Sequence, residues 1–300
     1  MTENRIRVAV GEHTAPSWVA NVKVMPRTPI GATARILRRI YRVVFTTGVV
    51  LLWSALAYCW IAPPSLATSL GRWCLAFAAA LVLPVLLLKW VNPTTTAFVV
   101  LNRRADRSPS AFQPHSRLAW VPLRDIAPAM ALAVLVGEDP YFFWHAGFNP
   151  IEILRAHRYN REERALGRNL RGGSTITQQL AKNLFLSPAQ SYIRKFLEAV
   201  FTALIEGLWS KRRILEMYLN VVQFGPAVFG ADAAAKHYFQ RPPLGLTPEQ
   251  AALLTAALRG PRLYCVEKPP AAMYALQASI LQRMQWCGEG MLAQLGERGS

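Results

Sequence analysis

Two adjacent acidic residues, Glu138 and Asp139, stand where an apolar run meets a cluster of aromatic residues, and their chemistry suits proton transfer. Residues 131–136 before them are entirely apolar, and residues 141–145 after them are four aromatic side chains and one histidine. A carboxylate beside apolar surface has a raised pKa because desolvation disfavours its charged form. Such a group suits a general acid or base near neutral pH. The alternative is that both are solvated charges at a helix end, and residue type alone leaves both interpretations open.

The stretch RGGSTITQQLAKN, residues 171–183, has the pattern of a loop that opens into a helix. Its two glycines free the backbone, and Ser174 or Thr175 can cap the helix that follows. A capped helix start with free amide groups is a ready site for an anion. Gln178 and Lys182 are four residues apart and share one face of that helix. The alternative is a capped surface helix with a polar exterior.

A third stretch, RKFLE, places Arg194, Lys195 and Glu198 within about one helical turn. One interpretation is an intrahelical salt bridge on a solvated face, which is common and weakly stabilising. The other is a carboxylate held beside two cations that bind phosphate. The second interpretation requires Lys182 and Glu138 to converge on the same cleft.

These residues need helices to position them, and from residue 121 onward the periodicity is mostly helical. No alternating strand pattern exceeds four or five residues, so the sequence predicts a mainly α domain. Thr247 followed by Pro248 predicts the start of one helix. The long apolar-periodic stretch at 193–222 is expected to bend or break near Ser210. The segment SKRRILEMYLN, which begins at Ser210, is interpreted as mainly structural.

The composition indicates a basic protein with an apolar N-terminal part. The chain has 300 residues, a net charge of +17 and 52% hydrophobic residues. That charge implies an anionic partner such as nucleic acid, anionic lipid or a phosphorylated substrate. No motif with interleaved aromatic and basic residues is present, so nucleic acid is not expected. Four cysteines are too few for a disulfide framework, and pairing of Cys265 with Cys287 is a minority interpretation.

Two apolar runs suggest a membrane region. Residues 43–62 carry no charge and match the length of a membrane-spanning helix, and residues 73–91 form a second run interrupted by Pro84. The basic residues that precede the first run favour a cytoplasmic N-terminus. Two spans would return the C-terminal domain to the cytoplasm, whereas one span would place it outside. The expected organisation is a basic tail at 1–42, a membrane region at 43–91, a connector at 92–120 and a catalytic domain at 121–300.

In order along the chain, these stretches resemble the motifs of the peptidoglycan glycosyltransferases (glycosyltransferase family 51). GEDPYFFWHAGF resembles the first motif, GGSTITQQLAKN the second, RKFLE the third and KRRILEMYLNVVQFG the fourth, and AALLTAALRGP resembles the helix that follows. The resemblance covers roughly residues 115–285. The chain carries no SxxK serine and no KTG, so we expect a monofunctional member without a transpeptidase domain.

The resemblance implies a lysozyme-like fold, with a head lobe and a jaw lobe flanking a cleft, preceded by one or two transmembrane helices. It implies an enzyme that polymerises lipid II onto a lipid-linked glycan strand, with inversion and with undecaprenyl pyrophosphate as the leaving group. Glu138 would be the general base and Glu198 would act at the pyrophosphate, through a divalent cation (Mg or Mn) or through its basic neighbours. The remaining positions that match the family's substrate-binding residues are Lys182, Arg194, Lys195, Ser174, Gln178, Gln179, Asn183, Arg155, Asp139, Phe142 and His145.

The resemblance also implies the bacterial inner membrane, with the catalytic domain on the periplasmic face and other wall-synthesis proteins as potential partners. His145 is interpreted as a hydrogen-bonded wall residue rather than a metal ligand. Three positions depart from the family pattern: Gly137 where Ala or Ser is common, Asn149 where the first motif usually ends in Asp, and Gln190 where many relatives carry Arg. Family members usually have one span, and its position corresponds to residues 73–91.

Two other functions remain open from the sequence. Lysozyme-like folds with one catalytic glutamate also cleave glycans, although hydrolysis needs no basic second and third motifs. A non-catalytic membrane scaffold is the other alternative, and the presence of Glu138, Lys182, Arg194 and Glu198 argues against it.

Overall fold

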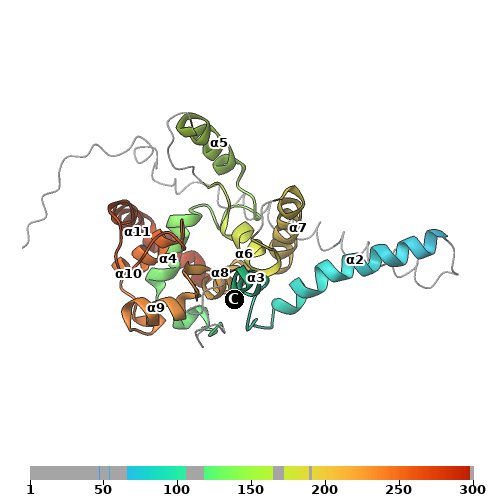
Figure 1. Cartoon of the computed structure of the whole chain (residues 1–300), viewed down its shortest axis with the longest axis horizontal. Helices are drawn as coiled ribbons and strands as arrows, with labels where there is room; N and C mark the ends of the chain where they lie inside the picture. The colour runs from blue at the N-terminus through green and yellow to red at the C-terminus, as the bar shows by residue number, and fades with distance from the viewer. Residues whose placement is uncertain are drawn as a thin grey trace, which may run out of the picture.

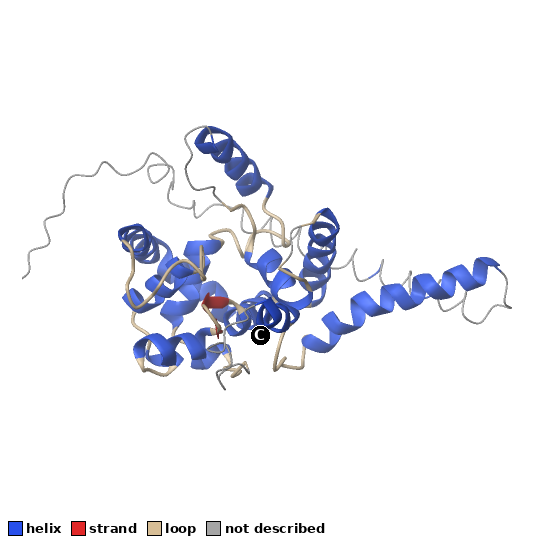
Figure 2. Ribbon diagram, viewed as in Figure 1, coloured by secondary structure: helices blue, strands red, loops and turns tan. Residues whose placement is uncertain are grey.

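The computed structural model describes residues 47, 54, 66–105, 118–164, 172–188 and 191–297, and these residues are mainly helical (Figure 2). The prediction of a mainly α domain is confirmed. The helices and strands are α2 (Leu66–Leu88), α3 (Ala97–Ala105), η3 (Leu123–Asp125), α4 (Pro128–Glu138), α5 (Pro150–Arg164), α6 (Ile176–Phe185), α7 (Tyr192–Leu208), α8 (Lys211–Val221), β1 (Gln223–Gly225), β2 (Val228–Phe229), α9 (Ala231–Phe239), η4 (Pro243–Gly245), α10 (Pro248–Ala257) and α11 (Ala271–Glu297).

The helices form two groups that meet at α6 and α8 (Figure 1). In one group α4, α10 and α11 pack against one another, and α9 lies on the same side of the molecule. In the other group α6 packs on α3 and α7, and α2 packs on α7. Helix α5 projects from the top of the view in Figure 1. Helix α3 lies within the stretch that the sequence suggests is a connector, so part of residues 92–120 belongs to the folded unit.

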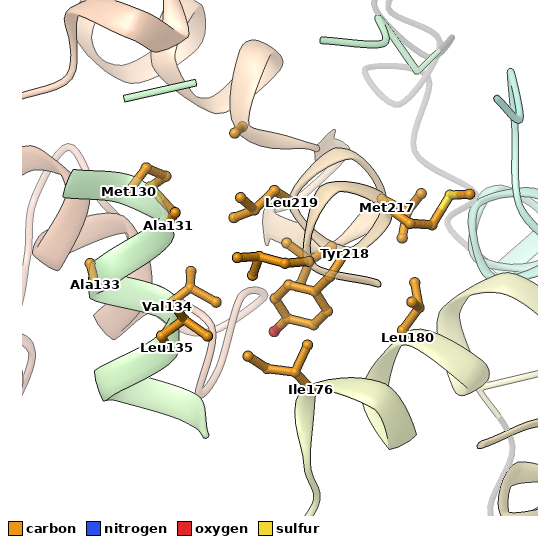
Figure 3. Packing of buried hydrophobic residues seen from close by; sticks show 14 of the residues in the cluster. Met130, Ala131, Ala133, Val134, Leu135, Ile176, Leu180, Met217, Tyr218 and Leu219 are labelled. Atoms are coloured by element: carbon orange, nitrogen blue, oxygen red, sulfur yellow. The ribbon is translucent and has the colours of Figure 1, made fainter. Parts of the chain in front are cut away.

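Helix α4 is apolar on every side and lies in the core of the domain. Seven of its consecutive residues, from Met130 to Val136, are buried. A helix that is hydrophobic all round must be enclosed by other elements. Figure 3 shows its side chains facing α8, where Tyr218 lies, and α6, which contributes Ile176 and Leu180. The C-terminal end of this buried helix presents Glu138 at the edge of the core.

Local sequence signals set the helix boundaries. A capping box of Thr175 and Gln178 starts α6, and Thr247 with Pro248 starts α10 in the same way, as predicted. The expected break near Ser210 is confirmed, since α7 ends at Leu208 and Ser210 caps α8. The hairpin of β1 and β2 is antiparallel and very short, in agreement with the absence of long alternating runs.

Helix α2 carries the second apolar run of the sequence and extends away from the rest of the domain (Figure 1). Its segment Ser69–Leu88 is long and apolar enough to cross a membrane, and little of it is buried in the protein. Large apolar side chains such as Trp73 and Phe77 are exposed on it. Of the first apolar run, residues 43–62, only residues 47 and 54 are described, so that predicted span lies outside the described structure.

Candidate active site

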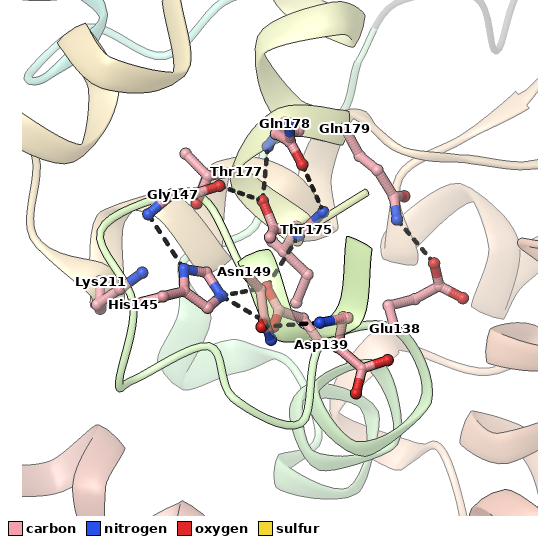
Figure 4. A network of polar contacts seen from close by, with 12 residues as sticks. Glu138, Asp139, His145, Gly147, Asn149, Thr175, Thr177, Gln178, Gln179 and Lys211 are labelled. Carbon is pink, nitrogen blue, oxygen red and sulfur yellow. Dashed lines mark hydrogen bonds and ion pairs between the residues drawn. The ribbon is translucent and has the colours of Figure 1, made fainter. Parts of the chain in front are cut away.

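The Glu138 carboxylate is bound by the side chain of Gln179 from α6. Gln179 Nε2 donates a hydrogen bond of 2.8 Å to Glu138 Oε2, and Tyr218 OH from α8 donates one of 2.8 Å to Gln179 Oε1 (Figure 4 shows the first). Tyr218 is fully buried, whereas Glu138 is only partly buried. The three residues thus form a chain of hydrogen bonds that runs from the core to the surface.

Electrostatics around Glu138 favours the protonated form. Burial raises the pKa of Glu138, and the hydrogen bond from Gln179 and the charge of Arg259 oppose that rise. Burial also raises the pKa of Tyr218 well above its usual value, so the phenol keeps the proton that it donates. The expectation of a desolvated carboxylate is confirmed in direction, and a base with a raised pKa removes a proton more readily near neutral pH.

Asp139 has a different role from its neighbour, because it is buried and fully engaged by the protein (Figure 4). His145 Nε2 lies 2.9 Å from both of its carboxylate oxygens, and the backbone N–H of Ile176 donates to Oδ2 at 3.1 Å. The backbone N–H of Gly147 donates to His145 Nδ1 at 3.1 Å, so Nε2 carries the hydrogen that points at Asp139. Asp139 and His145 therefore hold the loop that follows Glu138.

The start of α6 differs from the sequence expectation of an open anion site. The Asp139 carboxylate accepts a hydrogen bond from the first backbone N–H of the helix, and Thr175 Oγ1 accepts one from the N–H of Gln178 at 3.2 Å. The side chain of Gln178 is turned back to the N–H of Thr175 at 3.0 Å. An internal carboxylate and a capping box thus fill the place that was expected for the substrate. The structure gives Asp139 and Gln178 partners within the protein in place of the expected substrate contacts.

Phe142 is also buried, over an ion pair that the sequence does not indicate. Lys211 Nζ lies 2.6 Å from Glu206 Oε1 and 4.2 Å from the centre of the Phe142 ring. Thr177 Oγ1 donates to the same carboxylate oxygen at 2.6 Å. These side chains come from α6, α7, α8 and the loop after α4, so the ion pair joins four segments. Phe142 is completely buried and contacts this cluster rather than an open cleft.

Gly147 shows how tightly that loop is held. Its φ is +89°, and a Cβ atom there would lie 2.7 Å from Thr202 and 2.8 Å from Glu206. The Gly147 carbonyl accepts a hydrogen bond of 2.7 Å from Thr175 Oγ1. Only glycine fits this backbone conformation and this space. The loop is therefore attached to α6 at both of its ends, near Asp139 and at Gly147.

A group of cations surrounds Lys182, one turn further along α6 than Gln179. Glu198, which is 3% exposed, binds Arg194 Nη1 through one carboxylate oxygen at 3.1 Å and Lys195 Nζ through the other. Burial lowers the pKa of Lys182, and the Glu198 carboxylate opposes that change. The charges of both Glu198 and Glu138 act on the Lys182 ammonium group. Lys182 and Glu138 are thus near enough for their charges to interact, whereas the cleft that the sequence interpretation required stays a prediction.

The other expected positions fall into two kinds. Ser174 is exposed just before α6, and Arg155 is exposed on α5, where its guanidinium donates to Glu152 at 2.8 Å. Both are accessible to a ligand from solution. Asn183, in contrast, is buried on α6. Hydrogen bonds to Glu152 and to Tyr141 both raise the pKa of Arg155, so two side chains hold its exposed guanidinium.

Two departures from the family pattern have structural explanations. Asn149 Oδ1 accepts from the N–H of Glu152 at 3.1 Å and thus caps α5, which Asn does as well as Asp. A Cβ atom on Gly137 would lie 2.5 Å from Thr255 Cγ2, so glycine permits the close approach of α4 to α10. The third departure, Gln190, lies outside the described residues.

The expected divalent cation stays a prediction. No group of three or more His, Cys, Asp or Glu side chains there is arranged to hold a metal ion. Both oxygens of Glu198, the expected ligand, are already bound by Arg194 and Lys195. The donor set therefore suits a carboxylate that positions two cations better than it suits a metal ligand.

Several residues of the site's frame are missed by sequence reasoning. Tyr218 and Lys211 lie in a segment interpreted only as structural, and Glu206 lies in an apolar helical stretch. Arg259 and Arg283 act on Glu138 by their charge, and Arg283 Nη1 also donates to the carbonyl of Val136 at 2.7 Å. The one signal for Glu206 is a carboxylate within the otherwise uncharged run 199–209, which requires a buried partner.

Comparisons with known proteins agree with this arrangement. The model of the transglycosylase family matches residues 107–285. The chain is 40% identical to the biosynthetic peptidoglycan transglycosylase of Shewanella oneidensis over 232 residues, which cover 77% of this chain and 96% of that protein. It is 43% identical over 200 residues to the protein of the same name from Dechloromonas aromatica, covering 67% of this chain and 85% of that one. A third, from Pseudomonas fluorescens, is 43% identical over 220 residues, or 73% and 90% of the two chains.

Proposed function

Since the chain belongs to the transglycosylase family and is a peptidoglycan glycosyltransferase with a lysozyme-like domain, we propose that Glu138 is the general base of its transfer reaction. The observation that carries this proposal is that Gln179 and Lys182, three residues apart on one face of α6, lie beside Glu138 and beside the cation group. Gln179 binds Glu138, and Lys182, one turn further along α6, senses the charges of both Glu138 and Glu198. One helix thus presents a base and an anion site to the same substrate.

In the proposed reaction, the 4-hydroxyl of an incoming lipid II attacks the anomeric carbon of the lipid-linked glycan strand. Glu138 takes the hydroxyl proton as the new C–O bond forms. The bond from the anomeric carbon to the pyrophosphate breaks, and the pyrophosphate leaves with the electron pair and its lipid. Attack opposite to the leaving group inverts the configuration. The raised pKa of Glu138 supports this role, because a stronger base assists proton removal more in the transition state.

We propose that Lys182, Arg194 and Lys195 stabilise the leaving pyrophosphate. Preorganised cations that face the atom where charge develops lower the barrier without having to reorient. Glu198 supports this role by holding Arg194 and Lys195 in place from a buried position. The exposed side chains of Ser174 and Arg155 are proposed contacts to the sugar or phosphate groups. No step is assigned to a divalent cation, because Arg194 and Lys195 already bind both oxygens of Glu198.

We propose that α2 anchors the enzyme in the bacterial inner membrane and that the catalytic domain lies on the periplasmic face, where lipid II is used. The exposed apolar surface of Ser69–Leu88 supports anchoring. A reporter that is active only in the periplasm, fused after Ser300, tests the orientation. Activity of that fusion is expected, and activity only of a cytoplasmic reporter would contradict the placement. Other proteins of wall synthesis are proposed as partners at the membrane.

The replacement Glu138→Gln tests the assignment of the base. Purified wild-type protein is expected to convert lipid II into long glycan strands, and the variant is expected to form none while keeping the thermal unfolding temperature of the wild type. Glu267→Gln, a change of the same kind at an exposed position outside the site, is the control and should retain activity. Normal polymerisation by Glu138→Gln would remove Glu138 from this role.

The same assay separates polymerisation from glycan cleavage. A lytic enzyme would shorten preformed glycan strands and make none from lipid II. The three basic side chains beside Glu198 favour polymerisation, because hydrolysis of a glycan needs no pyrophosphate site.

A further inference from the structure

A hollow outside the active site lies where the C-terminal end of α2 meets the turn between α7 and α8. Its volume is about 420 Å³. It is lined by Lys89, Trp90, Gly207, Leu208, Trp209, Ser210 and Arg213. Three of these side chains are large and apolar, and three are basic or hydroxylic. The hollow is therefore amphipathic, with no carboxylate among its lining residues.

The walls of this hollow are fixed by hydrogen bonds between distant segments. Trp209 Nε1 donates to the carbonyl of Val85 at 2.8 Å, and this bond is buried. Arg213 Nη2 donates to the carbonyl of Leu88 at 2.9 Å and to Asn92 Oδ1 at 2.9 Å. These bonds attach the end of α2 to α8. The hollow is thus a built feature of the junction and does not depend on loose side chains.

The charge in the hollow favours an anion. Lys89 Nζ has no carboxylate partner among the described residues, and its contact there is with the ring of Trp90 at 5.0 Å. Ser210 caps α8, whose first amide groups carry the positive end of the helix dipole. The guanidinium of Arg213 is partly neutralised by Glu216 at 2.8 Å, so Lys89 supplies the main available charge.

The position of the hollow matches the headgroup layer of a membrane. Lys89 follows directly after the apolar segment Ser69–Leu88. Leu87 and Trp90 are 60% and 71% exposed, so an apolar surface leads from the segment to the mouth of the hollow. Trp and Lys are the side chains that collect at membrane interfaces, where basic groups attract anionic lipids.

We propose that this hollow binds a membrane phospholipid with an anionic headgroup. The lipid phosphate lies between Lys89, Ser210 and the start of α8, and the glycerol and the first chain carbons pack on Trp90 and Leu208. The site is distinct from the substrate site at Glu138 and Glu198. This proposal rests on the proposed anchoring of α2 in the membrane. A lipid bound there would fix the distance of the catalytic domain from the membrane surface.

Ser210 provides a matched pair of variants that tests the proposal. Asp and Asn are both good helix caps, so Ser210→Asp and Ser210→Asn preserve α8 and differ by one negative charge in the hollow. The full chain in neutral detergent is titrated with phosphatidylglycerol or phosphatidylcholine, and bound lipid is counted by native mass spectrometry. Wild type and Ser210→Asn are expected to retain one phosphatidylglycerol in preference to phosphatidylcholine. Ser210→Asp is expected to bind it roughly fivefold more weakly, the effect of one charge near a lipid surface.

Equal binding of phosphatidylglycerol by the Asp and Asn variants would overturn the proposal, as would equal binding of the two lipids by the wild type. Displacement of the lipid by millimolar inorganic phosphate would show a site for a free anion rather than a lipid, which also contradicts it. Flotation with phosphatidylcholine vesicles tests the anchoring separately. Failure to float would remove both the anchoring and the headgroup site, whereas polymerisation of lipid II in detergent would still test the role of Glu138.

Discussion

Replacing Tyr218 with Phe removes one oxygen atom from the centre of the domain and leaves the packing volume nearly unchanged. In the wild type that oxygen donates to Gln179 Oε1, and the amide at the other end of Gln179 donates to Glu138. Without the phenol, the Gln179 amide loses the bond that fixes its orientation. The amide can then rotate and present its oxygen, rather than its N–H, to the carboxylate of the base.

The size of the effect follows from these two hydrogen bonds. A buried acceptor that loses its partner costs about 1–3 kcal/mol, and a bond to a charged group contributes about 1.5–3 kcal/mol. If about 1–3 kcal/mol of this appears in the transition state, the rate falls by roughly 5- to 150-fold. Because the Gln179 hydrogen bond lowers the pKa of Glu138, losing that bond raises this pKa further. Glu138 must be unprotonated to act as the base. When the pH is lowered, the variant therefore loses activity at a higher pH than the wild type does.

The assay is the initial rate of lipid II polymerisation from pH 5 to pH 9, measured for the full chain in detergent. Tyr218→Phe is expected to lower the maximal rate and to move the acid limb of the profile to higher pH. Tyr238→Phe, the same change on helix α9, is the control and should leave the limb in place. If Tyr218→Phe has a normal rate and an unmoved acid limb, the hydrogen bonds of Gln179 do not set the pKa of Glu138 and the reasoning is refuted.

Three further outcomes are expected. Lys211→Met removes the cation that neutralises the buried Glu206 carboxylate and should destabilise the full chain by about 3–5 kcal/mol. Adding Glu206→Gln should restore much of the thermal stability. Equal unfolding temperatures of the single and double variants would contradict this. Arg259→Ala removes a charge that lowers the pKa of Glu138 and should move the acid limb of the rate profile to higher pH, and a shift to lower pH would show the opposite sign. Gly137→Ala should lower stability by about 1–3 kcal/mol because the new methyl group overpacks the contact of α4 with α10, as thermal unfolding would show.

The architecture was largely predictable where the signals are local. Helix caps depend on residues three apart, so Thr175, Ser210 and Thr247 mark helix starts in the sequence and in the structure alike. The apolar run of α4 predicts a buried helix because no face of it can bear water. The exposed apolar face of Ser69–Leu88 is equally readable, since length and composition alone define a candidate span.

The order of the motifs in the sequence also indicated candidate residues for the site. Residue type and spacing left the interpretation of Glu138, Lys182, Arg194 and Glu198 open, and the family resemblance assigned their expected roles. Arg194 and Glu198 are one turn apart on a helix, so their ion pair follows from local geometry.

Only the tertiary structure decided which of these groups are available to a substrate. Gln179 and Glu138 are 41 residues apart, and their hydrogen bond exists because α6 packs beside the end of α4. The same packing brings the Asp139 carboxylate to the amide of Ile176, which fills the helix start that looked open in the sequence. Contacts between residues distant in sequence depend on how the helices cross, and no local pattern records that. The resemblance thus pointed to Glu138 as the base, and the packing of α4 beside α6 is what gives Asp139 its partners within the protein.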